Sequence, residues 1–236
     1  MSFKFKQFEV EQKVNAHKVG TDSMILGAWV NSNFMNALDI GTGTGILALM
    51  LAQKNPQAII TGIEPNPESC IEAALNFKNS SFSNRLSAIN SSLQDFNSNQ
   101  LFDCIICNPP YFVDSTLSDD STKNSARHTI DLGVKDLYKN VANQLSDSGQ
   151  FSIVFPSNLL ESHLQSASDN GLFPYQILII ENDQKEAIRH LVSFKKEITS
   201  ILEERMIVKY SNGLYSKSYV ELTKDFHNRA LPFQKL

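Results

Sequence analysis

Residues 39–45 read Asp-Ile-Gly-Thr-Gly-Thr-Gly, and they lie between an apolar run at 37–40 and an apolar helical pattern that begins at Ile46. Glycines at a strand-to-helix junction let the backbone approach a ligand closely at the carboxyl end of a sheet. The dinucleotide fingerprint Gly-x-Gly-x-x-Gly would place its third glycine at Ile46, so this spacing differs from it. Asp39 would repel a pyrophosphate but suits a ligand with an ammonium group. The stretch therefore predicts a ligand-binding loop, with a plain tight turn as the simpler alternative.

Around this stretch, short apolar runs alternate with helical patterns. We expect strands at 37–40, 59–64, 86–89, 102–107, 151–155, 175–180 and 188–194. We expect helices from residue 46, over 67–76, from about residue 132 and over 158–169. Strands separated by helices indicate a mostly parallel sheet covered on both faces. Because only residues 181–187 separate the last two strands, these should form an antiparallel hairpin at one edge. The prediction is a seven-stranded α/β sheet of the doubly wound, Rossmann-like class.

The composition is that of an ordered globular protein, with 42% hydrophobic and 19% charged residues among 236. The longest apolar run, residues 46–52, is far too short to span a membrane, and the amino terminus shows no export signal. Cys104 and Cys107 form a CxxC within a buried-strand pattern, so we expect structural thiols. We expect no metal site, and a reduced, cytoplasmic setting fits these cysteines.

The formal net charge is −4, which taken alone argues against a nucleic-acid partner. The charge is unevenly distributed, however. Residues 30–183 hold 7 basic and 16 acidic residues, whereas residues 1–29 hold 4 and 3, and residues 184–236 hold 10 and 6. The two ends of the chain are therefore mildly basic around an acidic middle.

Glu64 ends the second expected strand, 21 residues beyond Gly43. An acid at this place can accept hydrogen bonds from both ribose hydroxyls of an adenosine-containing ligand. An exposed carboxylate at a strand end is the common alternative. Together with the glycine stretch, Glu64 predicts a nucleoside cofactor.

Asn108-Pro109-Pro110-Tyr111 directly follows the strand expected at 102–107, where a parallel sheet presents residues to its ligand crevice. The two prolines restrict the backbone and leave their carbonyls without internal partners. The asparagine oxygen and the first proline carbonyl can both accept hydrogen bonds from one NH2 group, and the tyrosine offers a stacking face. The segment predicts a site that aligns a planar amine, with a proline-rich turn as the alternative.

The combined motifs resemble the class I S-adenosylmethionine-dependent methyltransferases, in the branch that methylates planar exocyclic nitrogens through an (Asp/Asn/Ser)-Pro-Pro-aromatic motif. The resemblance implies S-adenosyl-L-methionine as cofactor and catalytic roles for Asn108, Pro109, Pro110 and Tyr111. Residues implied around the cofactor are Lys18, Thr21, Asp39, Gly41, Gly43, Glu64, Ser92 and Leu93. Residues 36–236 would form the methyltransferase domain. Residues 1–35 lie outside the strand–helix repeat, and we expect them to form an extension over the site.

Within this branch the chain is similar, over about residues 3–226, to bacterial tRNA adenine-N6 methyltransferases that modify adenine 37 beside the anticodon of a valine tRNA. The segments that carry the likeness are 5–8, 18–22, 26–29, 108–112, 126–128, Tyr219 and 222–226. The likeness implies a tRNA partner, no membrane, no obligate protein partner and a monomer. Basic residues that could contact RNA are Lys4, Lys6, Arg127, His128, Lys195 and Lys196, and for each of them an ordinary solvated charge is the alternative.

One departure concerns the adenine-contacting position after the third strand. Related enzymes often carry an aspartate there, and Ser92 and Leu93 align with it. Serine can still donate or accept a hydrogen bond, so the departure bears on cofactor affinity more than on the kind of cofactor.

Three alternatives stay open at this point. The same motif serves enzymes that methylate a protein glutamine amide, a guanine exocyclic amine or DNA adenine. The glutamine enzymes typically have a helical N-terminal domain, for which 35 residues leave no room. The DNA enzymes usually add a target-recognition domain, which we do not expect here. An NAD-dependent oxidoreductase is disfavoured by Ile46 in place of glycine. A non-catalytic adenosine-ligand or RNA-binding module would not require the amine-aligning segment that begins at Asn108.

Overall fold

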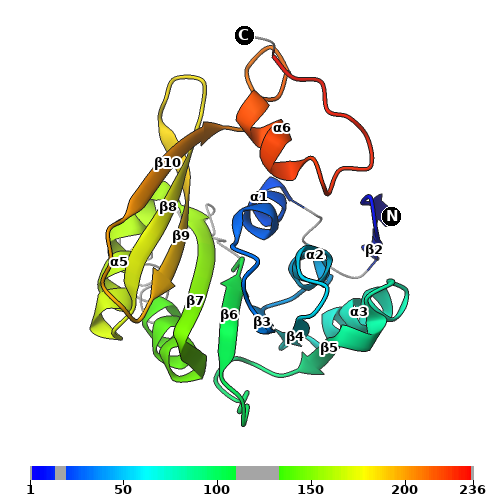
Figure 1. Cartoon of the computed structure of the whole chain (residues 1–236), viewed down its shortest axis with the longest axis vertical. Coiled ribbons are helices and arrows are strands. Elements are labelled where there is room, and N and C mark those ends of the chain that lie inside the picture. Colours follow the sequence, from blue (N-terminus) through cyan, green and yellow to red (C-terminus); the bar gives the residue numbers. More distant parts are fainter. Residues whose placement is uncertain (1, 14–19, 110–132, 235–236) are drawn as a thin grey trace, which may run out of the picture.

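The computed structural model describes residues 2–13, 20–109 and 133–234. One large sheet lies at the centre of the fold (Figure 1). Its strand order is β10-β8-β9-β7-β6-β3-β4-β5. The strands are β3 (Asn36–Ile40), β4 (Ile59–Glu64), β5 (Leu86–Asn90), β6 (Phe102–Cys107), β7 (Leu145–Pro156), β8 (Phe173–Glu181), β9 (Ala187–Lys195) and β10 (Leu202–Ile207). β9 runs antiparallel to both of its neighbours, and the other neighbouring pairs are parallel.

The predicted Rossmann-like α/β class is confirmed, with one correction to the sheet. β8 and β9 form the expected antiparallel hairpin, but β10 adds an eighth strand outside β8, so the hairpin does not form the edge. Three consecutive charged residues at 203–205 hide the alternation that a strand would show. These side chains are exposed at the sheet edge, where charge discourages pairing with another chain.

Helices cover both faces of the sheet (Figure 1). On one face lie α1 (Thr21–Trp29), α2 (Ile46–Lys54), α3 (Pro67–Lys78) and α6 (Lys217–Thr223), and on the other lie a helix at residues 133–144 and α5 (Leu160–Asp169). Short 3-10 helices are η1 (Ser83–Arg85) and η2 (Ser157–Leu159). In β3, Ala37 packs with the first face and Leu38 and Ile40 with the second, as the two-residue period of a strand requires. No described helix is long and apolar enough to cross a membrane.

The first described residues form a separate two-stranded sheet of β1 (Ser2–Lys4) and β2 (Glu9–Glu11). Asn76 on α3 fastens it, because its side chain accepts from the Glu11 N–H at 2.9 Å and donates to the Glu11 carbonyl at 3.0 Å. The same amide donates to the carbonyl of Thr44 at 2.8 Å. The N-terminal strands are thus tied to α3 and to the glycine stretch at once.

The CxxC cysteines lie on opposite faces of the sheet. Cys104 belongs to the core cluster under α1 and α2, and Cys107 to the cluster on the other face. Both thiols are buried, and burial raises the pKa of Cys104 to about 12. The prediction of buried thiols is confirmed. In the described ranges, no group of three or more His, Cys, Asp or Glu residues is arranged to hold a metal ion.

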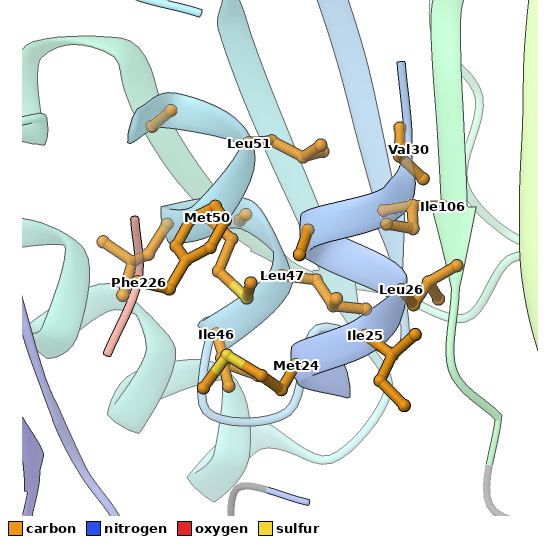
Figure 2. Close-up of a cluster of buried hydrophobic side chains, with 14 of the residues drawn as sticks. Met24, Ile25, Leu26, Val30, Ile46, Leu47, Met50, Leu51, Ile106 and Phe226 are labelled. Atoms are coloured by element: carbon orange, nitrogen blue, oxygen red, sulfur yellow. The ribbon is translucent and has the colours of Figure 1, made fainter. Parts of the chain in front are cut away.

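α1 and α2 pack closely against each other, which fixes α1 above the end of β6 (Figure 2). Leu47 of α2 lies between the two helices, near Leu26 of α1 (Figure 2). A Cβ on Gly27 would lie 2.6 Å from the Met50 sulfur, so the absent side chain permits this approach. The side chains of α1 are therefore placed by close packing of this helix against α2.

Gly45, at the start of α2, is a position where a side chain should damage the fold. Its φ is +83°, and a Cβ there would lie 2.3 Å from a ring carbon of Phe77. We expect Gly45→Ala to lower the free energy of unfolding by about 2–4 kcal/mol, from left-handed strain and overpacking together. Urea unfolding would measure this loss.

Gly171→Ala is the matched control, because Gly171 has a φ of +71° with no atom within 4 Å of a Cβ. It should lose only the strain energy, about 1–2 kcal/mol. Equal losses in the two variants would contradict the role assigned to Phe77.

Candidate active site

The glycine stretch, Glu64 and Asn108 come together because the strands that precede them are neighbours. Ile40, the last residue of β3, pairs with Ile63 of β4 on one side and with Cys107 of β6 on the other. Parallel strands finish at the same end of a sheet, where α/β proteins bind their ligands. The three segments therefore meet at one end, which we call the carboxyl end of the sheet.

A cavity of about 390 Å³ opens at this carboxyl end. Residues expected in the site that line it are Gly41, Ser92, Leu93 and Pro109. Apolar residues of the strands and of the helix at 133–144 also line it, among them Ile40, Ile63, Val134 and Leu137. A largely apolar cleft with a few placed polar groups is the usual form of a small-molecule site.

Asp39 holds the glycine stretch in place from beneath. Its carboxylate is fully buried, and Oδ2 accepts hydrogen bonds from the Thr42 hydroxyl at 2.6 Å and from the Ala48 N–H at 3.1 Å. Among the described residues, no donor reaches the buried Oδ1. Burial raises the pKa of Asp39 to about 7, although the two hydrogen bonds oppose the shift. Asp39 does not line the cavity, so its contact to a ligand stays a prediction.

The raised pKa of Asp39 gives a testable pH dependence. Because its pKa is about 7 in the folded protein and 3.8 for an ordinary aspartate, Asp39 contributes stability fully below about pH 4, and that stability is lost as the pH rises to about 7. The amide of an Asp39→Asn variant keeps an acceptor for Thr42 and Ala48 without charging. We therefore expect the unfolding free energy of the wild type, relative to the variant, to fall by up to about 4 kcal/mol over this range.

Chemical unfolding of both proteins across the same pH range measures this difference. Asp169→Asn, on the exposed end of α5, is the control for the same change of side chain at the surface. A pH-independent difference for Asp39→Asn would show that the Asp39 pKa is not raised.

Glu64 connects the glycine stretch to the end of β4. Its Oε2 accepts the N–H of Gly43 at 3.0 Å, and its Oε1 accepts the N–H of Asn66 at 3.0 Å. Each carboxylate oxygen still has a lone pair for a further donor. The side chain is half-buried, so the carboxylate is oriented by the backbone without being closed off from solvent.

Asn108 follows β6 directly, and its amide is held by α1. The Nδ2 atom donates to the Ser23 hydroxyl at 2.7 Å. Among the described residues, no donor engages Oδ1, which stays available as an acceptor. Its neighbour Pro109 lines the cavity. The remaining residues expected around this point, Lys18, Pro110, Tyr111, Arg127 and His128, lie outside the described residues.

Ser92 and Leu93 lie in the segment after β5 and line the cavity, and their contact with the cofactor stays a prediction. The Ser92 hydroxyl donates to Asp95 Oδ2 at 2.6 Å and accepts the Asp95 N–H at 3.2 Å. An aspartate is thus present in this segment, three residues beyond the aligned position. Its carboxylate orients the Ser92 hydroxyl.

Comparison with known proteins decides the family. The profile of the family described as "Methyltransferase small domain" matches residues 15–167. A tRNA1(Val) (adenine(37)-N6)-methyltransferase from Bacteroides fragilis is 38% identical over 233 residues, covering 95% of this chain and 97% of the relative. This chain belongs to the methyltransferase small-domain family. A protein of the same name from Pseudoalteromonas translucida is 39% identical over 228 residues, with the same coverage.

Solved methyltransferase structures share the fold at low sequence identity. A "predicted O-methyltransferase" from Agrobacterium tumefaciens superposes with a TM-score of 0.67 at 17% identity, covering 92% of this chain and 100% of that one. A methyltransferase from Pyrococcus furiosus gives 0.59 at 22%, covering 81% and 90%. The predictions of methyltransferase class and fold are confirmed, and the oxidoreductase and binding-module alternatives are set aside.

The cofactor of this methyltransferase is S-adenosylmethionine, and the site has the features that it requires. At Gly41, where φ is +66°, a Cβ would meet no atom within 4 Å, so the backbone borders open space at the cavity wall. Glu64 presents an oriented carboxylate next to Gly43. Below the same loop lies the buried carboxyl group of Asp39, whose Oδ1 is engaged by no described donor. These features suit a cationic nucleoside.

Lys4, Lys6, Lys195 and Lys196 are the described basic residues expected to contact RNA, and none of them lines the cavity. Lys4 forms an ion pair with Glu9 at 3.9 Å, and Lys6 is exposed next to the N-terminal strands. Lys195 pairs with Phe173, the first residue of β8, which places it at the amino end of the sheet. Lys196 reaches Asp147 at 3.4 Å.

Thr21 is exposed at the start of α1. It lines a second groove, of about 510 Å³, in which Asp22 and Arg189 also take part. The structure therefore places Thr21 at the carboxyl end of the sheet but outside the cavity that Gly41 and Pro109 line.

Two notable residues at this site, His163 and Ser23, were not predicted from the sequence. His163 of α5 lines the cavity, stacks on Phe155 with ring centroids 3.9 Å apart, and shares a 3.0 Å hydrogen bond with the Tyr138 hydroxyl. Burial lowers its pKa to about 4, so its ring is neutral at physiological pH. Ser23 contacts Asn108 from 85 residues away in the sequence. Neither residue belongs to a local motif, so no sequence signal pointed to it.

Proposed function

We propose that this chain transfers a methyl group from S-adenosylmethionine to the exocyclic N6 of adenine 37 in the anticodon loop of a valine tRNA. The observation that carries the proposal is the position of Asn108, at the carboxyl end of β6 beside the cavity, with an amide oxygen that no described donor engages. Relatives that carry this activity in their names match nearly the whole chain, which supports the choice of substrate.

Asn108 and Pro109 prepare the target amine for attack. The amine of adenine is a poor nucleophile, because its lone pair is delocalised into the ring. The Asn108 oxygen and the Pro109 carbonyl accept its two hydrogens and turn the lone pair toward the cofactor. As positive charge develops on the nitrogen, these hydrogen bonds become stronger, which lowers the barrier. The cationic product loses its proton readily, so no dedicated base is required.

The other site residues hold the two substrates. Bound S-adenosylmethionine supplies an electrophilic methyl group. Gly41, Gly43 and Asp39 border its methionine and ribose parts, Glu64 accepts from the ribose hydroxyls, and Ser92 and Leu93 border its adenine. Lys18 and Thr21 lie toward its amino-acid end, and Pro110 and Tyr111 support and stack on the target base. Because adenine 37 is in a single-stranded loop, moving it out of its stack is inexpensive.

RNA contacts in this proposal come from basic residues near the ends of the chain and from the segment after Tyr111. Lys4, Lys6, Arg127 and His128 approach phosphates, and residues 1–35 act as an extension over the site. Contacts to Lys195 and Lys196 would require the tRNA to reach the amino end of the sheet. The enzyme acts in the cytoplasm as a monomer, without an obligate protein partner.

Transfer of a labelled methyl group to total unmodified tRNA, with digestion and identification of the labelled nucleoside, tests this function. The expected product is N6-methyladenosine. Label in the guanine N2 position of RNA, in DNA adenine or in protein glutamine would point to another planar nitrogen and overturn the substrate. DNA and protein are therefore offered in parallel reactions.

A further inference from the structure

We propose that Ser23 is a positioning residue for Asn108, holding its amide so that the oxygen faces the target amine. The inference rests on the proposed function and adds to it a residue that contacts neither substrate. It starts from the 2.7 Å hydrogen bond between Asn108 Nδ2 and the Ser23 hydroxyl.

The two ends of an asparagine amide have opposite chemistry, because the oxygen accepts and the nitrogen donates. The adenine amine brings two donors, so only the oxygen of Asn108 can hold it. A rotated amide would direct its own NH2 group at the amine, and donor would face donor. In the structure Nδ2 is engaged on the α1 side, which leaves Oδ1 directed away from α1.

Ser23 is suited to this task because its hydroxyl is nearly shielded from water. The residue is 8% exposed, so a solvent molecule competes poorly for the Asn108 amide. Asn108 itself is half-buried next to the cavity. In such surroundings a hydrogen bond restricts a side chain more strongly than it does in water.

α1 keeps Ser23 at a fixed place. At its start, Asp22 Oδ2 accepts from Arg189 Nε of β9 at 3.0 Å. At its end, the Lys54 ammonium of α2 donates to the carbonyls of Ala28 and Val30. Between these points, α1 packs on α2 through the apolar cluster of Figure 2. The hydrogen bond to Asn108 therefore originates from a helix anchored at both ends.

Loss of the Ser23 hydroxyl should reduce the rate and leave cofactor binding intact. We expect Ser23→Ala to lower kcat for tRNA methylation about 10-fold, because catalysis depends on the alignment of the acceptor. The KM and Kd for S-adenosylmethionine should be unchanged. Ser80→Ala is the matched control, since the half-buried Ser80 donates to the Phe77 carbonyl and accepts from the Phe82 N–H, far from Asn108, and its kcat should equal that of the wild type.

A double-mutant cycle with Asn108→Ser separates positioning from a general structural role. The variant keeps a Ser-Pro-Pro-Tyr motif but has no Nδ2 for Ser23 to hold, so adding Ser23→Ala to it should cause little further loss of kcat. The inference would be overturned if Ser23→Ala lowered kcat equally in the wild type and in the Asn108→Ser variant. It would also be overturned if Ser23→Ala did not lower kcat in the wild type. If the wild type methylates a different planar nitrogen, the proposed function fails, and the cycle is measured on that acceptor instead.

Discussion

Asn108→Ala should lower kcat by roughly 100- to 1000-fold, comparable to removing one preorganised hydrogen-bond partner from a reacting group. The alanine lacks the oxygen that accepts from the target amine, while the residues assigned to the cofactor remain. Cofactor affinity should therefore change little. Steady-state methylation at saturating tRNA and S-adenosylmethionine, together with calorimetric titration of S-adenosylmethionine, measures both quantities.

Asn170→Ala is the control for this substitution. Asn170 is also half-buried and donates from Nδ2 to the Ser166 carbonyl at 2.8 Å, but it lies after α5, immediately before β8 begins at the amino end of the sheet. Its removal should leave kcat unchanged. Near-normal turnover by Asn108→Ala would exclude Asn108 as the residue that holds the amine.

Glu64→Gln should weaken S-adenosylmethionine binding by roughly 10- to 100-fold, in line with the loss of hydrogen bonds to a charged group. Both Glu64 oxygens accept a backbone N–H, one from Gly43 and one from Asn66. A glutamine has only one acceptor, so its NH2 group would face one of these two donors. The substitution thus removes an acceptor for the ribose and also loosens the connection to the glycine stretch.

Titration calorimetry and the rise in melting temperature with added S-adenosylmethionine both report this loss. Glu161→Gln, an exposed carboxylate in the first turn of α5, should bind the cofactor like the wild type. At saturating cofactor, kcat of Glu64→Gln should approach the wild-type value. An unchanged affinity for S-adenosylmethionine would show that Glu64 only accepts the backbone N–H groups of Gly43 and Asn66 and does not bind the cofactor.

Much of the sheet could be predicted because its central strands are buried on both faces. β4 and β6 begin and end at the residues expected from their apolar runs. β10 was missed because half of it is charged, which is tolerable only at an exposed edge. The strand expected at 151–155 begins earlier, at Leu145, because its first residues include the polar stretch 146–150, which does not show an apolar strand pattern.

The candidate site could be predicted where it depends on strand ends. Gly41, Ser92, Leu93 and Pro109 line one cavity because each follows a parallel strand. What could not be predicted depends on packing between distant elements, as in the contact of Ser23 with Asn108. The net charge of −4, taken alone, argues against a nucleic-acid partner, whereas the proposed substrate is a tRNA.

The most direct test of the central claim compares two valine tRNA transcripts that differ only at position 37, one with adenine and one with guanine. The wild-type enzyme and labelled S-adenosylmethionine are supplied to both. We expect N6-methyladenosine in the adenine transcript and no label in the guanine transcript. Equal labelling of the two transcripts, or no labelling of either while another nucleic acid or a protein is methylated, would contradict the assignment of adenine 37 as the target.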